Sequence, residues 1–70
     1  MPEKWTGRLI GKMHNEGITQ EDVAAEMGVT KSYISMILNG SRKPDGARSR
    51  LEGAVDAIIE RRNSDVKEDS

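Results

Sequence analysis

Two short helical patterns that meet at one glycine, Gly28, constrain this chain more than any other feature. The first pattern places a small residue, Ala24, four positions before that glycine. The second carries apolar residues at Val29, Ile34 and Ile37, which can lie on one face of a helix. Glycine readily takes up the left-handed conformation that follows a helix end, so we expect a sharp turn at this point. The apolar face of the second helix can then fold back onto the first.

Helical periodicity continues on both sides of this pair, with no alternating strand pattern and no internal repeat. A chain of 70 residues holds one domain. The sequence therefore predicts an all-α fold, a compact bundle of four helices over about residues 4–16, 20–27, 31–39 and 47–62. The residues expected on the inward faces are Trp5, Leu9, Ile10 and Met13, then Val23, Ala24 and Met27, then Ile34, Ile37 and Leu38, and finally Ala47, Leu51, Ala54, Val55 and Ile58.

The expected helix ends carry capping residues. Thr19, followed three positions later by Asp22, forms a capping-box-like pair, and Thr30 suits the N-cap of the next helix. Gly17 suits the left-handed position that closes the first helix. After about residue 62 the chain is polar and charged, so we expect one domain over residues 1–62 and a disordered tail over residues 63–70.

The net charge of −1 conceals an uneven distribution of charged residues. The segment from Lys31 to Arg50 holds five basic residues against a single acid, Asp45. Acids gather instead on the second predicted helix and in the tail, at Glu21, Asp22, Glu26, Asp65, Glu68 and Asp69. Because electrostatic steering depends on the local field and not on the total charge, the basic segment favours a polyanionic partner.

Other function classes are disfavoured by the composition. The chain has no cysteine and one histidine, His14, so we expect no metal site, no cofactor and no enzymatic activity. A chain this short has little room for a cleft, so no small-molecule substrate is expected. No apolar run approaches the roughly 20 residues that cross a membrane, and residues 1–4 lack the apolar core of a signal peptide. We expect a cytoplasmic protein.

The turn at Gly28 has the spacing of a helix-turn-helix, over about residues 19–39, whose second helix enters the DNA major groove. That helix, about residues 31–39, would present its N-terminal residues and outward face to base edges. Lysine can donate to guanine O6 and N7, serine can bond to any base edge, and a threonine or methionine methyl group can pack on a thymine methyl group. The predicted base-reading residues are Thr30, Lys31, Ser32, Ser35 and Met36, with guanine beneath Lys31.

Polar and basic residues around this helix suit the DNA backbone. Thr19 and Gln20 stand at a helix start, where free backbone N–H groups also attract phosphate. Such contacts set the register of the protein on DNA without reading sequence. The predicted phosphate-binding residues are Thr19, Gln20, Tyr33, Asn39, Arg42 and Lys43.

The segment from Gly17 to Pro44 resembles the helix-turn-helix of lambda-repressor-like regulators, the Cro and phage-repressor (XRE-type) family. The matching framework positions are Gln20, Ala24, Gly28, Val29, Ile34 and Ile37, followed by Asn39-Gly40, basic residues and Pro44. The resemblance implies a Cro- or repressor-like transcriptional regulator that binds double-stranded DNA as a homodimer. It also implies that Gln20 and Asn39 contact phosphate. The family commonly has five helices, whereas here one long segment replaces the last two.

A second function remains open beside this one. The same scaffold can serve as a protein-interaction module, such as an antitoxin or an anti-repressor partner, because a fold does not determine a function. The working surface would then be the last helix or the acidic group formed by Glu21, Asp22 and Glu26.

Three single positions also have alternative roles. Met36 can fill a gap in the core instead of facing DNA, and the Tyr33 ring can cover the edge of the core. Ile59, together with Val55 and Ile58, can form the seam of a dimer.

Overall fold

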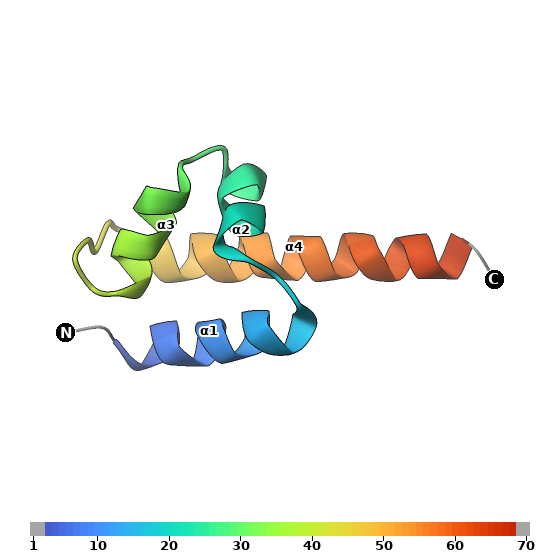
Figure 1. The fold of residues 1–70 in the computed structure, drawn as a ribbon, viewed down its shortest axis with the longest axis horizontal. Coiled ribbons are helices and arrows are strands. Elements are labelled where there is room, and N and C mark those ends of the chain that lie inside the picture. The colour runs from blue at the N-terminus through green and yellow to red at the C-terminus, as the bar shows by residue number, and fades with distance from the viewer. Residues whose placement is uncertain (1–2, 69–70) are drawn as a thin grey trace.

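Four α-helices make up the described part of this computed structural model, which covers residues 3–68 and the side chains of residues 3–64. In the view of Figure 1, α4 runs along the length of the molecule, α1 lies below it, and α2 and α3 lie above it. The helices are α1 (Lys4–Glu16), α2 (Gln20–Met27), α3 (Lys31–Leu38) and α4 (Ala47–Glu68). The described residues contain no strand, so the predicted all-α class is confirmed.

Side-chain oxygens that accept hydrogen bonds from backbone amides cap the predicted helix starts. Thr19 Oγ1 accepts from the Asp22 amide at 3.1 Å, and the Asp22 carboxylate accepts from the Thr19 amide at 3.0 Å, so the capping box is complete. The Thr19 amide and, after it, the Thr19 side chain stabilise the ionised carboxylate and hold the pKa of Asp22 below its ordinary value. Thr30 Oγ1 accepts from the Tyr33 amide at 3.1 Å and caps α3. Each bond satisfies an amide that a helix start leaves without a partner.

The turn between α2 and α3 depends on the left-handed conformation of Gly28, whose φ is 71°. Just after it, the Val29 amide donates to the Ala24 carbonyl at 3.0 Å, so the chain turns back towards the helix it has left. An L side chain rarely adopts this φ, which explains why glycine stands at the bend. The turn brings α3 against α2, as the sequence predicted.

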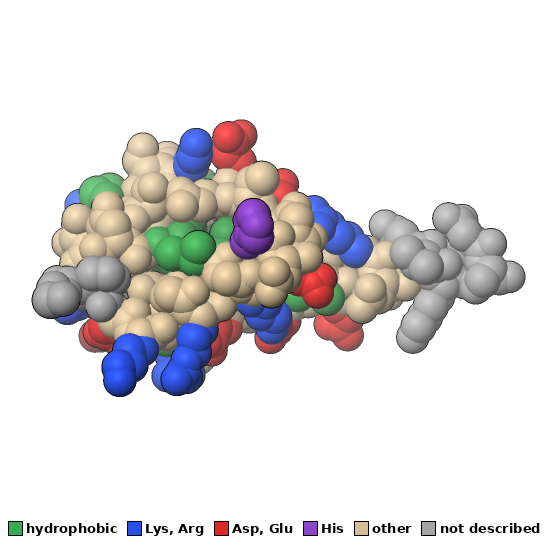
Figure 2. All heavy atoms as spheres, turned by 60° about the horizontal axis from the view of Figure 1, so that its bottom comes forward, with side chains coloured by type: hydrophobic (Ala, Val, Ile, Leu, Met, Phe, Trp, Pro, Cys, Tyr) green, Lys and Arg blue, Asp and Glu red, His purple; other side chains and the backbone are tan. Residues whose placement is uncertain are grey.

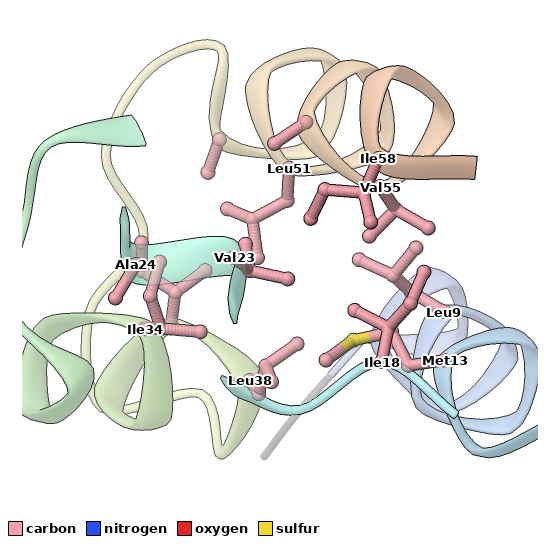
Figure 3. Close-up of a cluster of buried hydrophobic side chains, with 13 residues drawn as sticks. Leu9, Met13, Ile18, Val23, Ala24, Ile34, Leu38, Leu51, Val55 and Ile58 are labelled. Carbon is pink, nitrogen blue, oxygen red and sulfur yellow. The ribbon is translucent and has the colours of Figure 1, made fainter. Parts of the chain in front are cut away.

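All four helices contribute to one hydrophobic core (Figure 3). Ala24 of α2 lies next to Ile34 of α3, which is the packing expected from a small residue placed ahead of the turn. The side chains of Ile34, Leu51, Val23 and Val55 are fully buried. Among the described side chains, the buried apolar residues are Leu9, Met13, Ile18, Val23, Ala24, Ile34, Ile37, Leu38, Ala47, Leu51, Ala54, Val55 and Ile58.

The prediction that Ile10 faces inward is wrong. Ile10 is 45% exposed, whereas Leu9 and Met13 of the same helix are buried. α1 packs along a narrow face, so an apolar residue at one margin of its stripe stays in contact with solvent. At the other margin, Trp5 is half-buried against the core and its indole N–H donates to the Glu3 carboxylate at 2.8 Å.

α4 begins where the sequence predicted but ends later. The Ala47 amide donates to the Pro44 carbonyl at 3.1 Å, and the helix continues to Glu68 instead of ending near residue 62. Neither proline nor glycine occurs after Gly53, so the sequence contains no strong stop signal for this helix. Residues 63–68, which we predicted to be disordered, are helical here, and residues 69–70 lie outside the described part of the chain.

The dimer seam suggested on α4 conflicts with the core. Val55 is 0% exposed and Ile58 is 5% exposed, so both are already buried within one copy of the chain. Ile59 is half-buried and also packs against the core. Val55 and Ile58 therefore belong to the core of one copy, and of the three residues only Ile59 keeps part of its side chain at the surface.

Charged side chains connect α4 to the two helices beside it. The Arg62 guanidinium donates to the Glu16 carbonyl at 2.8 Å and lies 3.8 Å from the Asp22 carboxylate, so it links the end of α1 to the start of α2. Lys12 of α1 lies 2.8 Å from the Asp56 carboxylate of α4. Exposed ion pairs are worth at most about 1 kcal/mol each, so burial of the apolar core supplies most of the stability.

Candidate nucleic-acid interface

α3 has a buried face and an exposed N-terminal end. Ile34, Ile37 and Leu38 are buried in the core. Lys31 and Ser32, the first two residues of the helix, are exposed. Because the opposite face is anchored, the exposed end points in a fixed direction. The helix can therefore meet a ligand without first having to fold.

The remaining predicted base-reading residues lie beside that end. Thr30 is exposed, and its hydroxyl oxygen serves as the N-cap of α3. Ser35 and Met36 are half-buried. Among the described residues, the half-buried apolar side chains that pack against the core are Trp5, Met27, Val29, Tyr33 and Ile59. Met36 is not in this group, which favours its outward role over the alternative that it fills a gap in the core.

Ser35 is bonded to the neighbouring helix. Its hydroxyl donates to Gln20 Oε1 at 2.9 Å, and both residues are half-buried. The bond uses the hydroxyl hydrogen of Ser35 but leaves its oxygen able to accept, and it leaves the amide N–H₂ of Gln20 able to donate. A residue predicted to read bases and a residue predicted to bind phosphate are thus held together.

Lys31 has an acidic neighbour that the sequence-based prediction of the site did not include. Its Nζ lies 3.8 Å from a carboxylate oxygen of Glu21, in the first turn of α2. The two side chains are 60% and 75% exposed. Ten positions separate them along the chain, and they meet only because α2 and α3 pack together. No local signal in the sequence pairs these two residues.

The end of α3 and the loop after it present the other predicted phosphate-binding residues. Asn39 is exposed and its side-chain oxygen accepts from the Ser41 amide at 2.9 Å. The Arg42 guanidinium carbon lies 6.0 Å from the centre of the Tyr33 ring, within the range of a cation–π contact. Tyr33 covers the edge of the core, as one alternative held, and also supports Arg42. Arg42 and Lys43 are exposed.

The acidic group on α2 lies beside basic side chains of α3 and α4. Its ion pairs are Glu21 with Lys31, Asp22 with Arg62, and Glu26 with Arg61. Each acid of the group thus has a basic partner on a neighbouring helix.

The face on the α1 side carries mixed charges (Figure 2). Basic and acidic side chains lie together there, and the single histidine is exposed. Within residues 3–68, no group of three histidine, cysteine or acidic side chains is arranged to hold a metal ion. In the same range, no helix combines the length and the apolar character needed to cross a membrane.

A family model described as helix-turn-helix matches residues 14–50, which is more than half of the chain. Neither the comparison with curated proteins nor that with solved structures returned a match. The matched range runs from the end of α1 through α2 and α3 to the start of α4, and it includes every residue predicted to contact DNA. The resemblance seen in the sequence is thereby confirmed. The chain belongs to the helix-turn-helix family of the Cro/C1 type, the XRE-like DNA-binding regulators.

Proposed function

We propose that the protein is a sequence-specific transcriptional regulator that binds double-stranded DNA with α3 in the major groove. The observation that carries the proposal is the exposure of Lys31 and Ser32 at the start of a helix whose opposite face is buried. A major groove about 12 Å wide accommodates an α-helix presented in this way. Membership of the helix-turn-helix family supports DNA as the ligand.

Base reading falls to the exposed end and outward side of α3. Lys31 donates to O6 and N7 of guanine, Ser32 bonds to a neighbouring base edge, and the Met36 methyl group packs on a thymine methyl group. Ser35, whose hydroxyl hydrogen is engaged by Gln20, accepts a hydrogen bond from a base amino group. Thr30 adds a methyl contact beside them.

Phosphate binding falls to the surroundings of α3. The start of α2 offers backbone N–H groups to one phosphate, and the amide group of Gln20 has donors left for the same strand. Arg42, held over the Tyr33 ring, and Lys43 bind phosphates beyond the other end of α3. The full proposed set is Thr19, Gln20, Tyr33, Asn39, Arg42 and Lys43.

The proposed active form is a homodimer. α3 has only 8 residues, so one copy makes few base contacts. Two copies related by a twofold axis would place their α3 helices about 34 Å apart, on successive major grooves of one DNA face. Such a regulator works on chromosomal or phage DNA, so the proposal includes a cytoplasmic location at the nucleoid.

Selection of bound duplexes from a random pool, at two salt concentrations, tests the proposal. We expect enrichment of a twofold-symmetric site with guanine at the position of Lys31. Neutralising about 4–6 phosphates per half-site gives a log–log salt slope of about −4 to −5 per half-site. Absence of enrichment, or binding that does not respond to salt, would refute the proposal.

A variant of the reading end serves as the control. K31A/S32A changes only exposed positions, so its circular dichroism should match that of the parent protein. It should no longer select the enriched site. If it selects the same site with the same strength, α3 is not the reading element.

A further inference from the structure

An acidic side chain beside the main base-reading lysine is unexpected on a surface that meets a polyanion. The Glu21 carboxylate lies 3.8 Å from Lys31 Nζ and its side chain is 75% exposed. Glu21 also follows Gln20 directly, in the turn of α2 that offers N–H groups to phosphate. A carboxylate at this place is repelled by the DNA backbone and weakens binding to every duplex.

We propose that Glu21 is a specificity-determining residue that positions Lys31 for guanine and keeps it from phosphate. The inference rests on the function proposed above. A lysine ammonium group has three N–H donors. If one is directed to Glu21, two remain, and guanine presents two acceptors, O6 and N7, at its major-groove edge. A guanine complex therefore takes up the other two donors and keeps the ion pair with Glu21.

A contact between Lys31 and a phosphate breaks the ion pair with Glu21. To reach the backbone, Lys31 must leave Glu21, and the carboxylate then stands beside the phosphates without a counter-charge. Phosphate contacts supply most of non-specific binding. The pair thus disfavours non-specific complexes more than the complex with guanine.

The rest of the motif keeps the two side chains close. Gln20, the neighbour of Glu21, accepts a hydrogen bond from Ser35 of α3 at 2.9 Å. Ala24 and Ile34 pack against one another in the core below (Figure 3). The two helices are therefore held at a fixed separation, so Glu21 remains within reach of Lys31.

A double-mutant cycle tests this role. The full chain, E21Q, K31A and E21Q/K31A are titrated with the selected duplex and with a scrambled duplex over a range of salt. E21Q should raise the affinity for the scrambled duplex about 3- to 10-fold and steepen its salt slope by about 0.9, since Lys31 gains one phosphate. For the selected duplex we expect a gain of less than about 2-fold. In the K31A background, E21Q should affect both duplexes equally.

E60Q is the matched control, because Glu60 is exposed on α4 and forms no ion pair with any described residue. It makes the same change in net charge as E21Q, so it measures the effect of net charge on DNA binding without any change beside Lys31. The inference is overturned if E21Q acts equally on both duplexes, as E60Q should. It is also overturned if E21Q abolishes a preference for cytosine, since Glu21 would then read a base itself. A parent protein that selects no duplex at all would refute the proposed function instead.

Discussion

Ser35 of α3 donates a hydrogen bond to Gln20 at the start of α2, and this 2.9 Å contact lies between the folding core and the proposed DNA surface. Both residues are half-buried, so water competes for the bond only in part. The contact fixes a side chain proposed for base reading and one proposed for phosphate binding. It is therefore expected to affect both stability and binding.

Replacing Ser35 by alanine should show both effects. Loss of the hydrogen bond should lower the free energy of unfolding by about 0.5–1.5 kcal/mol in urea denaturation. DNA affinity should fall for all duplexes, because Gln20 is no longer held in place, and it should fall further for the selected site, because the hydroxyl of Ser35 no longer accepts from a base. Ser32→Ala is the control. Ser32 is exposed, so its stability should stay within about 0.5 kcal/mol of the parent. Equal destabilisation by both substitutions would contradict the role of the bond.

Alanine at two glycines should change stability in opposite directions. Gly28 has a φ of 71°, so Gly28→Ala should cost about 1–2 kcal/mol. Gly11 lies inside α1, and a Cβ there meets no atom within 4 Å, so Gly11→Ala should stabilise by up to about 1 kcal/mol. Thermal or urea unfolding measures both. Gly28→Ala without loss of stability would show that the left-handed turn does not matter, and Gly11→Ala with loss of stability would contradict the open space at that position.

The capping box should make stability depend on acid pH. Hydrogen bonds from Thr19 lower the pKa of Asp22 from its ordinary value of 3.8, so the ionised form is favoured in the folded state. The resulting stabilisation is present above pH 3.8 and is lost as the pH falls through the lower folded-state pKa. Titration followed by NMR should place the pKa of the Asp22 carboxyl below 3.8. T19A removes the hydroxyl but keeps the backbone amide, which is the larger cause, so it should move this pKa only part of the way back. A pKa of 3.8 or above in the parent protein would mean that the cap does not set it.

Two basic residues should have separable effects on DNA binding. Lys31→Ala should relax the preference for one base pair at a cost of about 1–3 kcal/mol on the best site. Arg42→Ala should weaken all duplexes alike and reduce the salt slope by about 0.9, as the loss of one phosphate contact requires. Arg8→Ala, at an exposed position of α1, is the control and should change neither quantity. Identical behaviour of the Lys31 and Arg42 variants on every sequence would refute the division of roles.

The helix starts could be predicted because their signals are local. The cap bonds between Thr19 and Asp22, and between Thr30 and Tyr33, join residues three positions apart in the chain. The turn at Gly28 depends only on the φ angle of that one glycine. The exposed start of α3 followed from the spacing of Ile34 and the other buried residues of that helix. These features depend on neighbours in sequence, so periodicity and capping rules suffice for them.

Other features depend on how the helices meet, and the sequence pattern does not contain that information. Ile10 shares an apolar stripe with Leu9, but the width of the face that α1 buries is set by its partners. The pairing of Glu21 with Lys31 exists only after α2 and α3 have packed. The C-terminal end of α4 lies in a segment without glycine or proline, where the helix propensities of neighbouring residues are similar. No single residue in this segment therefore determines where the helix ends.

The matched helix-turn-helix ends at residue 50, yet Leu51 and Val55, which complete the core beneath α2 and α3, come after it. In an isolated fragment of residues 14–50, Val23 and Ile34 would be exposed to water. The recognisable motif is therefore smaller than the cooperative folding unit. A chimaera that contains α2 and α3 of this protein must therefore also contain α1 and α4, or other helices that bury the same apolar faces.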